Sequence, residues 1–352
     1  MKVKKTIILI SIILVAIFVT TLTFGSLDAQ AADKVYRLKI QSAYPRSDPS
    51  MELLKDFAST AKRMSKGRIR IQVFADPELV PAEQLFEATQ RGTLDMLHAV
   101  AAMWGGILPI GEVEFGLPYA YNLPGEPDIF TAGKQIRDLF YNTGFVDLLR
   151  EEYAKQGLYW LDVHSYGPIF TMATKKITTC DDMKGLKFRV EGSWADYYNA
   201  LGARGTYISG MDAYMGLKLG TIDASQWDVS AITGLNWHEV APYWLMGGQN
   251  DVVVGHILFN MKSWNALPDD LKNVMTAAAE DYFNKLLKIY VGELKKVDDL
   301  VKAGKVIKSE IDAACDRKHE EAALVLWDKI AQRDPAAAKA IGIIKDWRKT
   351  LK

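Results

Sequence analysis

The stretch from Gly185 to Trp227 constrains the fold of this chain more than any other. It contains three short strand patterns separated by two patterns of aromatic and aliphatic residues at helical spacing. Strands are expected at residues 187–190, 206–208 and 221–228, and helices at residues 194–201 and 212–220. This alternating order is typical of a parallel α/β unit. Such units bind ligands at the carboxyl ends of their strands, where Arg189 and the run from Gln226 to Asp228 are expected.

Local signals mark where the two helices of this stretch begin and end. Ser193 and Asp212 are the expected N-caps, because a short polar side chain can accept a hydrogen bond from a free backbone N–H of the first turn. Gly202 and Gly220 follow the helices and suit the left-handed backbone with which many helices end. The sequence therefore predicts two short helices with defined ends.

Three motifs in the same stretch resemble one protein family. They are Gly-Leu-Lys-Phe-Arg-Val from Gly185, Ala-Leu-Gly-Ala from Ala200, and Leu-x-x-Gly-Thr-Ile-Asp-Ala from Leu217. In this order they are similar to the signature of the solute receptors of TRAP transporters, the DctP-type family. The resemblance implies an α/β, two-lobed periplasmic binding protein (type II-like) with several interlobe crossings and a helical C-terminal region. It also implies a non-enzymatic receptor that delivers a small organic anion to TRAP membrane permease subunits.

The first 31 residues have the features of a secretory signal peptide. Three lysines precede an apolar run from Ile7 to Val19, and Ala29-Gln30-Ala31 fits a cleavage site of small residues. The alternative is an uncleaved membrane anchor, for which the apolar run is short. We therefore expect export to the periplasm and a mature chain that begins at Ala32.

The rest of the chain is expected to form two lobes and a helical tail. Lobe I is predicted at residues 32–160 with residues 249–262 returning to it, lobe II at residues 161–248, and a C-terminal helical region that packs on both lobes at residues 263–352. Strands are expected at residues 35–40, 69–74, 94–98, 158–164 and 251–260, helical structure at residues 128–156, and a turn at residues 165–168. The sequence leaves open whether the tail helices form a homodimer.

Charge and cysteine content exclude some classes of function. The chain has 43 basic and 43 acidic residues, so there is no electrostatic reason to expect nucleic-acid binding. Its two cysteines, Cys180 and Cys315, could pair in an oxidising compartment, but geometry decides this and not spacing. We expect two isolated thiols rather than a bridge. Neither cysteine has a neighbouring cysteine or a histidine-rich surrounding, so no zinc site is expected.

Arg189 is the expected anchor of the solute. A guanidinium donates two parallel hydrogen bonds to a carboxylate and keeps its charge when partly desolvated. Spacing alone would allow an exposed strand arginine equally well, whereas the resemblance implies that Arg189 grips the carboxylate of the solute. The sialic-acid branch of the family has a second arginine where this chain has Ile169. The pattern thus predicts a monocarboxylate or a sulfonate rather than sialic acid or a dicarboxylate.

The resemblance is nearest to the ketoacid- and monocarboxylate-binding subgroup, which has a tryptophan at the position of Trp227. In that subgroup a Glu-Trp pair and a glutamine from a lobe-crossing strand help to hold a metal ion. This chain has Gln226 instead of the glutamate, and Ser165 or Tyr166 instead of that glutamine. We therefore expect no cofactor. The alternative is a bound cation such as calcium or sodium, which needs several oxygen ligands. Its ligands would come from Gln226, Asp228 and Gln249.

Other side chains are expected to complete the binding pocket. Tyr44, Trp104 and Tyr166 would provide aromatic walls for a solute with an apolar or aromatic body. The full predicted set is Tyr44, Trp104, Ser165, Tyr166, Arg189, Glu191, Gln226, Trp227, Asp228 and Gln249. Tyr207 and Met211 are instead expected in the core.

An enzyme on the same scaffold is the alternative function. A secreted lyase or hydrolase acting on an organic acid in the interlobe cleft would need a positioned acid or base. The candidates are Glu191, Asp228 and His164, and nothing in the sequence pairs them. No catalytic residue is therefore assigned.

Overall fold

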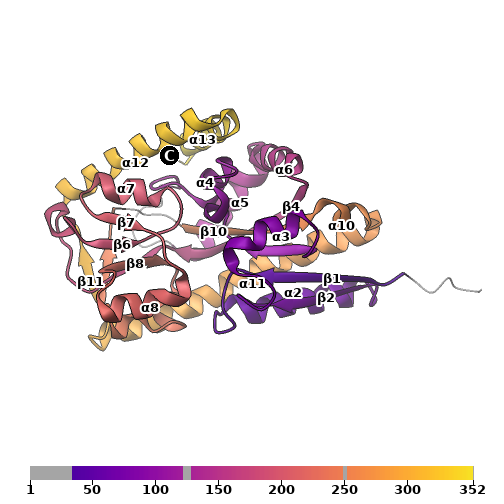
Figure 1. Cartoon of the computed structure of the whole chain (residues 1–352), viewed down its shortest axis with the longest axis horizontal. Coiled ribbons are helices and arrows are strands. Elements are labelled where there is room, and N and C mark those ends of the chain that lie inside the picture. The colour runs from indigo at the N-terminus through magenta and orange to yellow at the C-terminus, as the bar shows by residue number, and fades with distance from the viewer. Residues whose placement is uncertain (1–33, 122–127, 249–251, 352) are drawn as a thin grey trace, which may run out of the picture. The chain divides into compact units, whose positions relative to one another are not determined.

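The computed structural model describes residues 34–121, 128–248 and 252–351. The predicted signal peptide and Gln249 lie outside these residues. The fold below is that of residues 37–352, which form one unit. Its strands fall into two sheets, one of five strands and one of six (Figure 1).

The first sheet has the strand order β2-β1-β3-β10-β4. Its strands are β1 (Tyr36–Ser42), β2 (Ile69–Phe74), β3 (Met96–Ala99), β4 (Leu158–Pro168) and β10 (Val252–Asn260). β1 and β3 are parallel, whereas β10 is antiparallel to both β3 and β4. β10 is buried along its whole length, which explains its continuous apolar sequence. The helical segments that accompany the first sheet are η1 (Ala82–Gln84), η2 (Ala101–Trp104), α2 (Ser50–Met64), α3 (Leu85–Gln90), α4 (Ile110–Phe115), α5 (Ile129–Asn142), α6 (Phe145–Lys155) and α10 (Met261–Asn265).

The second sheet has the strand order β11-β9-β5-β8-β6-β7. Its strands are β5 (Phe170–Ala173), β6 (Lys187–Arg189), β7 (Arg204–Thr206), β8 (Ala224–Trp227), β9 (Tyr243–Met246) and β11 (Ile307–Glu310). β6 runs parallel to both β7 and β8, which confirms the predicted parallel unit. The short helical segments that accompany the second sheet are η3 (Cys180–Met183), α7 (Trp194–Ala200), α8 (Gly210–Leu219), α9 (Ser230–Thr233) and η4 (Trp237–Glu239).

Several local predictions around these strands were wrong. β7 ends at Thr206, so Tyr207 lies just beyond the strand. β4 continues to Pro168 instead of turning at residue 165, because it pairs with β10 along this part of its length. Ser193 makes no side-chain cap, since its hydroxyl donates to Glu112. α8 is capped by Ser209, which accepts from the backbone N–H of Met211, and not by Asp212.

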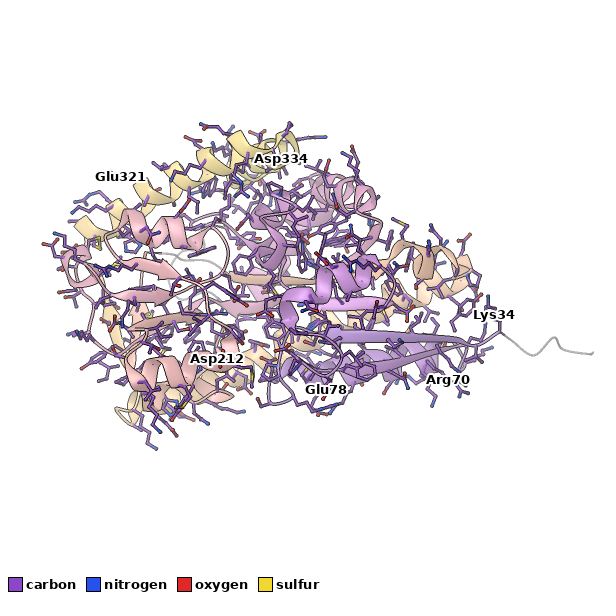
Figure 2. The ribbon with its side chains drawn as sticks, viewed as in Figure 1. Lys34, Arg70, Glu78, Asp212, Glu321 and Asp334 are labelled. Atoms are coloured by element: carbon purple, nitrogen blue, oxygen red, sulfur yellow. A yellow bond between two sulfur atoms is a disulfide. The ribbon has the colours of Figure 1, made fainter. Side chains whose placement is uncertain are left out.

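The C-terminal part of the chain is helical. It consists of α11 (Asp269–Lys302), α12 (Ala313–Arg333) and α13 (Pro335–Arg348). α12 lies beside α7 and α13 beside α4 (Figure 1). Asp334 sits where α12 gives way to α13 and caps α13 by accepting from Ala337 N at 2.8 Å (Figure 2). Among the described residues, no helix is both long and apolar enough to cross a membrane.

A disulfide joins Cys180 in η3 to Cys315 in α12. The prediction of two isolated thiols was wrong. The two residues are 135 positions apart, and the fold brings their Cα atoms to 5.2 Å. That separation lies within the range that a bridge requires, but no local pattern encodes it. The disulfide therefore ties the C-terminal helices to the second sheet.

Candidate functional site

A cavity opens where six strands end. Its walls come from segments that follow β1, β2 and β3 of the first sheet and β6, β7 and β8 of the second. It contains about 60 Å³ of space open to the centres of water molecules. Since roughly 10–15 Å³ of such space holds one water, the cavity suits a molecule of a few heavy atoms. This is the strand-end position that the parallel unit predicted for a ligand.

Arg189, the last residue of β6, forms part of the cavity wall while only 1% of its surface is exposed. Its Nε donates to Ile208 O at 2.9 Å and its Nη1 to Gln226 O at 3.1 Å, and Nη2 pairs with the carboxylate of Glu191. These contacts fix the plane of the guanidinium. A guanidinium carries five N–H donors, so these three bonds with described residues leave capacity for a ligand.

Two aromatic rings flank this guanidinium. Its Cζ lies 5.0 Å from the ring centroid of Trp227 and 5.6 Å from that of Tyr207. Contacts at these distances stabilise a cation on a ring face. Trp227 is itself held by a hydrogen bond from its Nε1 to Ser230 Oγ at 3.1 Å. The cavity thus has a rigid wall that is cationic and aromatic.

Gly210, the first residue of α8, allows the Trp227 ring its position. A Cβ added at Gly210 would lie 2.5 Å from Cη2 of Trp227, far inside van der Waals contact. Gly210 and Trp227 both line the cavity. The glycine is therefore required by the close approach of the ring.

We predict that Gly210→Ala displaces the Trp227 ring and weakens solute binding about tenfold, the lower part of the range for overpacked sites. Isothermal titration calorimetry with a solute that binds the wild type measures this. Gly292→Ala is the matched control, because a Cβ there meets nothing within 4 Å. Equal affinities of the Gly210→Ala variant and the wild type would contradict the packing role.

Asp228 and Asp48 form a buried carboxyl pair beside the cavity. Asp228 Oδ1 accepts from Ser230 N at 2.7 Å, and Ser230 Oγ donates to Asp48 Oδ2 at 3.3 Å. Burial, followed by the negative charge of Asp48, raises the pKa of Asp228 to about 8. Burial also raises the pKa of Asp48. This carboxyl pair therefore holds a proton up to higher pH than an isolated carboxyl does.

Two further acidic residues, Asp76 and Glu83, line the cavity from the first-sheet side. Glu83 Oε1 accepts from the hydroxyl of Tyr207 at 2.8 Å. Burial and, to a smaller extent, the charge of Glu83 raise the pKa of Asp76. The two carboxyls are thus close enough to influence each other.

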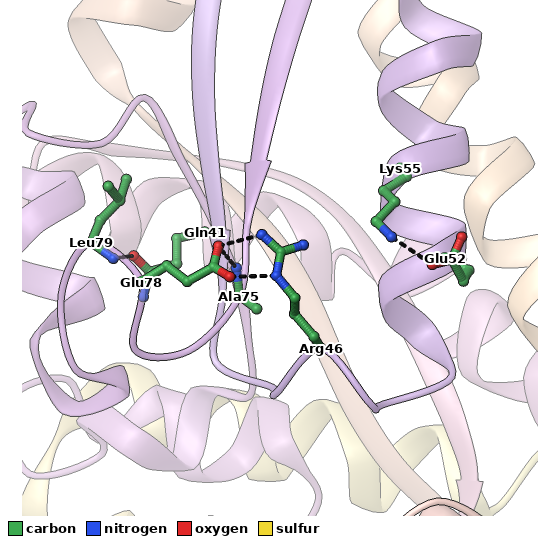
Figure 3. A network of polar contacts seen from close by, with 7 residues as sticks. All are labelled: Gln41, Arg46, Glu52, Lys55, Ala75, Glu78 and Leu79. Carbon is green, nitrogen blue, oxygen red and sulfur yellow. Dashed lines mark hydrogen bonds and ion pairs between the residues drawn. The ribbon is translucent and has the colours of Figure 1, made fainter.

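A polar network holds the loops that carry the cavity-lining residues Tyr44 and Asp76 (Figure 3). Arg46 pairs with both carboxylate oxygens of Glu78, at 2.5 and 2.7 Å. Glu78 Oε2 also accepts from Ala75 N at 3.1 Å, and Gln41 Oε1 accepts from Leu79 N at 3.2 Å. The network joins the loop after β1, with Tyr44, to the loop after β2, with Asp76. It therefore fixes one wall of the cavity.

Among the described residues, three hydrogen bonds between two side chains connect first-sheet segments to second-sheet segments near the cavity. Ser193 Oγ donates to Glu112 Oε2 at 2.8 Å, Ser230 Oγ donates to Asp48 Oδ2, and the hydroxyl of Tyr207 donates to Glu83. We call these three bonds the cross-sheet ties. Each uses only groups of the protein.

Six of the ten predicted site residues line the cavity: Tyr44, Arg189, Glu191, Gln226, Trp227 and Asp228. Three others lie elsewhere. Trp104 stacks on Phe86 and donates from Nε1 to the hydroxyl of Tyr153 at 3.0 Å. Tyr166 is buried and its hydroxyl hydrogen bonds to His164 and His98, while Ser165 Oγ accepts from Gly167 N. Gln249 lies outside the described residues.

The expectation that Tyr207 and Met211 are core residues was wrong. Both line the cavity, with 45% and 53% of their surfaces exposed. β7 ends at Thr206, so the strand-end rule applied at the correct position would have found Tyr207. Asp76 follows β2 and Glu83 lies in η1, and both were missed because no motif marks them.

Two of the three residues considered for a cation, Gln226 and Asp228, line the cavity, and Gln249 lies outside the described residues. Asp228 Oδ1 already accepts a hydrogen bond from Ser230 N at 2.7 Å. Calcium takes roughly six to eight oxygen ligands. Gln226 and Asp228 supply fewer oxygen atoms than calcium needs, so we assign them no metal-binding role.

Comparison with known proteins places this geometry in context. Residues 40–334 match the family model described as bacterial extracellular solute-binding protein, family 7 (DctP). A monocarboxylate 2-oxoacid-binding periplasmic protein of Nostoc sp. is 26% identical over 251 residues, which cover 69% of this chain and 65% of the relative. An ectoine/5-hydroxyectoine-binding periplasmic protein of Ruegeria pomeroyi is 27% identical over 219 residues, covering 60% of this chain and 61% of the relative. The match thus spans less than two thirds of each of these relatives.

Solved structures show the same fold. A TRAP periplasmic solute-binding protein from Pseudoalteromonas atlantica, solved with bound sodium and pyruvate, superposes with a TM-score of 0.82. It is 23% identical, and the superposition covers 90% of this chain and 95% of that chain. The similarity confirms the predicted α/β binding-protein fold class.

Proposed function

The chain belongs to the bacterial extracellular solute-binding proteins of family 7, as its motifs predicted, and on this premise we propose that it is the solute receptor of a TRAP transporter. Its solute is a small organic acid, with monocarboxylates such as keto-, hydroxy- or aromatic acids as the first candidates. The protein captures this solute and does not transform it.

The observation that supports this most is the position of Arg189. Its guanidinium is fixed by three hydrogen bonds, flanked by two rings, and set in the wall of a small cavity. A preorganised cation loses little freedom when it binds, which favours affinity for a carboxylate. Trp227, Tyr44 and the apolar side chains of Met211 and Val253 then pack the body of the solute.

Capture is expected to involve closure of the two sheets over the solute. The cross-sheet ties would form on closure and break on opening, as in hinge motions of binding proteins. Residues 1–31 would direct the chain to the periplasm as a cleaved signal peptide. The closed receptor would then dock on the membrane permease subunits.

The enzyme alternative gains no support from the positions of its candidate groups. Glu191 is paired with Arg189, Asp228 accepts a hydrogen bond from Ser230 N, and His164 is buried against Tyr166. Glu191 and Asp228 line the cavity, but His164, the one candidate base that is not a carboxylate, lies outside the lining. A receptor role accounts for them better.

Ligand release followed by mass spectrometry tests the proposal. Purified protein is denatured, small molecules are collected, and a panel of monocarboxylates, sulfonates and aromatic acids is then screened by thermal shift. Binding of an organic acid without conversion is the expected result, with a melting temperature that rises with concentration. Formation of a product from the bound acid, or no acid binding at all, would reject the receptor role.

A further inference from the structure

The charges that line the cavity do not match a simple anion. Arg189 is the one basic residue in the described lining, against four acidic residues: Asp76, Glu83, Glu191 and Asp228. Glu191 already pairs with Arg189, and burial together with the charge of Asp48 raises the pKa of Asp228. Asp76 and Glu83 therefore add negative charge that no described basic side chain in the lining balances. A solute with only a carboxylate would meet repulsion from this wall.

One oxygen of the Asp76 carboxyl lacks a partner among the described residues, although the group accepts a backbone hydrogen bond from Ala82. Its Oδ1 is shielded from solvent and accepts no hydrogen bond from a described residue. A buried carboxylate oxygen without a donor is costly, and native structures usually supply one from protein, water or ligand. Asp76 lines the cavity, and rotation of its carboxyl group would expose this oxygen to a donor on a solute.

Tyr207 connects the basic and acidic sides of the cavity. Its ring centroid lies 5.6 Å from Arg189 Cζ, and its hydroxyl donates to Glu83 Oε1 at 2.8 Å. The two sides are thus separated by about the length of one tyrosine side chain. Charges a few bonds apart on one small molecule can reach both, and the aromatic rings between them tolerate a positive charge.

We propose that the solute is a zwitterion, with a carboxylate that binds Arg189 and a protonated nitrogen that donates N–H bonds to Asp76 and Glu83. This inference rests on the proposed receptor function and specifies its solute class. The unpartnered Asp76 oxygen favours an ammonium or amidinium with N–H donors over a quaternary ammonium group, which has none. It also removes the need for a bridging cation, because the solute carries its own positive charge.

Pairs of acids with the same shape and a different charge test this. Proline is compared with cyclopentanecarboxylate, and 4-aminobutanoate with pentanoate, because in each pair one nitrogen replaces one carbon. The pairs are included in a wider pool of small amino acids and nitrogen-free acids, which is incubated with wild-type protein. Retained molecules are identified by ultrafiltration and mass spectrometry, with N,N-dimethylproline as the analogue without N–H donors. We expect the retained molecules to be acids with N–H cations.

Variants then test whether the preference for nitrogen-bearing acids depends on Asp76 and Glu83. Asp76→Asn and Glu83→Gln are expected to weaken binding of the nitrogen-bearing acid about 10- to 100-fold, because each removes a charged hydrogen-bond acceptor. Binding of the nitrogen-free partner should change little or not at all. Glu87→Gln is the matched control, because this residue carries the same charge on α3 but lies outside the lining. Melting temperatures without solute check that all three variants fold.

The possible outcomes separate this inference from the receptor function. Retention of nitrogen-free acids in preference to their nitrogen-bearing partners would overturn the zwitterion and leave the receptor intact. Binding of nitrogen-free acids that requires calcium or sodium, and that is lost with a chelator, would also overturn the zwitterion and leave the receptor function intact. An equal loss for both members of a pair in Asp76→Asn and Glu83→Gln would assign these residues a structural role. Retention of no acid of either kind would count against the receptor function itself.

Discussion

Replacing Arg189 with alanine is expected to weaken binding of the solute at least 100-fold, or about 3 kcal/mol. The variant removes the only described basic side chain of the cavity lining and leaves Glu191 without its partner. The carboxylate of the solute then meets only neutral or negative groups. Isothermal titration calorimetry with an acid that binds the wild type measures the effect.

Arg204→Ala provides the control for this prediction. Arg204 lies on the neighbouring strand β7, is exposed, and is not part of the cavity lining. Its removal changes the net charge equally and should change affinity by less than about twofold, since exposed charges contribute little. Arg189→Lys should recover part of the affinity, because lysine restores the charge without the planar donors. Comparable affinities for Arg189→Ala and Arg204→Ala would refute the anchoring role.

Replacing both Cys180 and Cys315 with serine is expected to lower the free energy of unfolding by about 4 kcal/mol. The bridge closes a loop of 135 residues, and long closed loops restrict the unfolded chain most. Urea denaturation of the variant beside the wild type measures the difference, and the wild type under reducing conditions should resemble the variant. Neither cysteine lines the cavity, so the affinity for the solute should be unchanged at a temperature at which the variant is folded. Equal midpoints for variant and wild type would show that the bridge does not stabilise the fold.

Features encoded by short sequence patterns were predictable. The alternation from Ile69 to Phe74 gave β2 at the correct bounds, and the strands around Arg189 gave the parallel unit. Features that depend on distant partners were not. Ser193 has an ideal cap sequence, but Glu112 from α4 competes for its hydroxyl. The cysteine pair likewise depends on how η3 and α12 approach each other.

The candidate site also contains some residues that local patterns predict and others that depend on distant partners. Arg189 and Trp227 follow from the rule that ligands bind at strand ends, because each lies at the end of a strand that its own neighbours define. Trp104 could not be excluded from sequence, since its place against Phe86 and Tyr153 results from packing of distant helices. Asp76 and Glu83 reach the cavity only because the loop after β2 meets segments of the second sheet. Prediction of a complete pocket therefore requires the tertiary fold.

The cross-sheet ties have a kinetic consequence. Since they join protein groups to protein groups, nothing in their chemistry requires a solute, and a shut but empty receptor is held by the same bonds. Solute entry then has to wait for these bonds to open. The observed rate of association should level off at high solute concentration, at the opening rate of the empty protein, instead of rising in proportion. Weakening a tie, for example with Ser193→Ala, should raise that plateau.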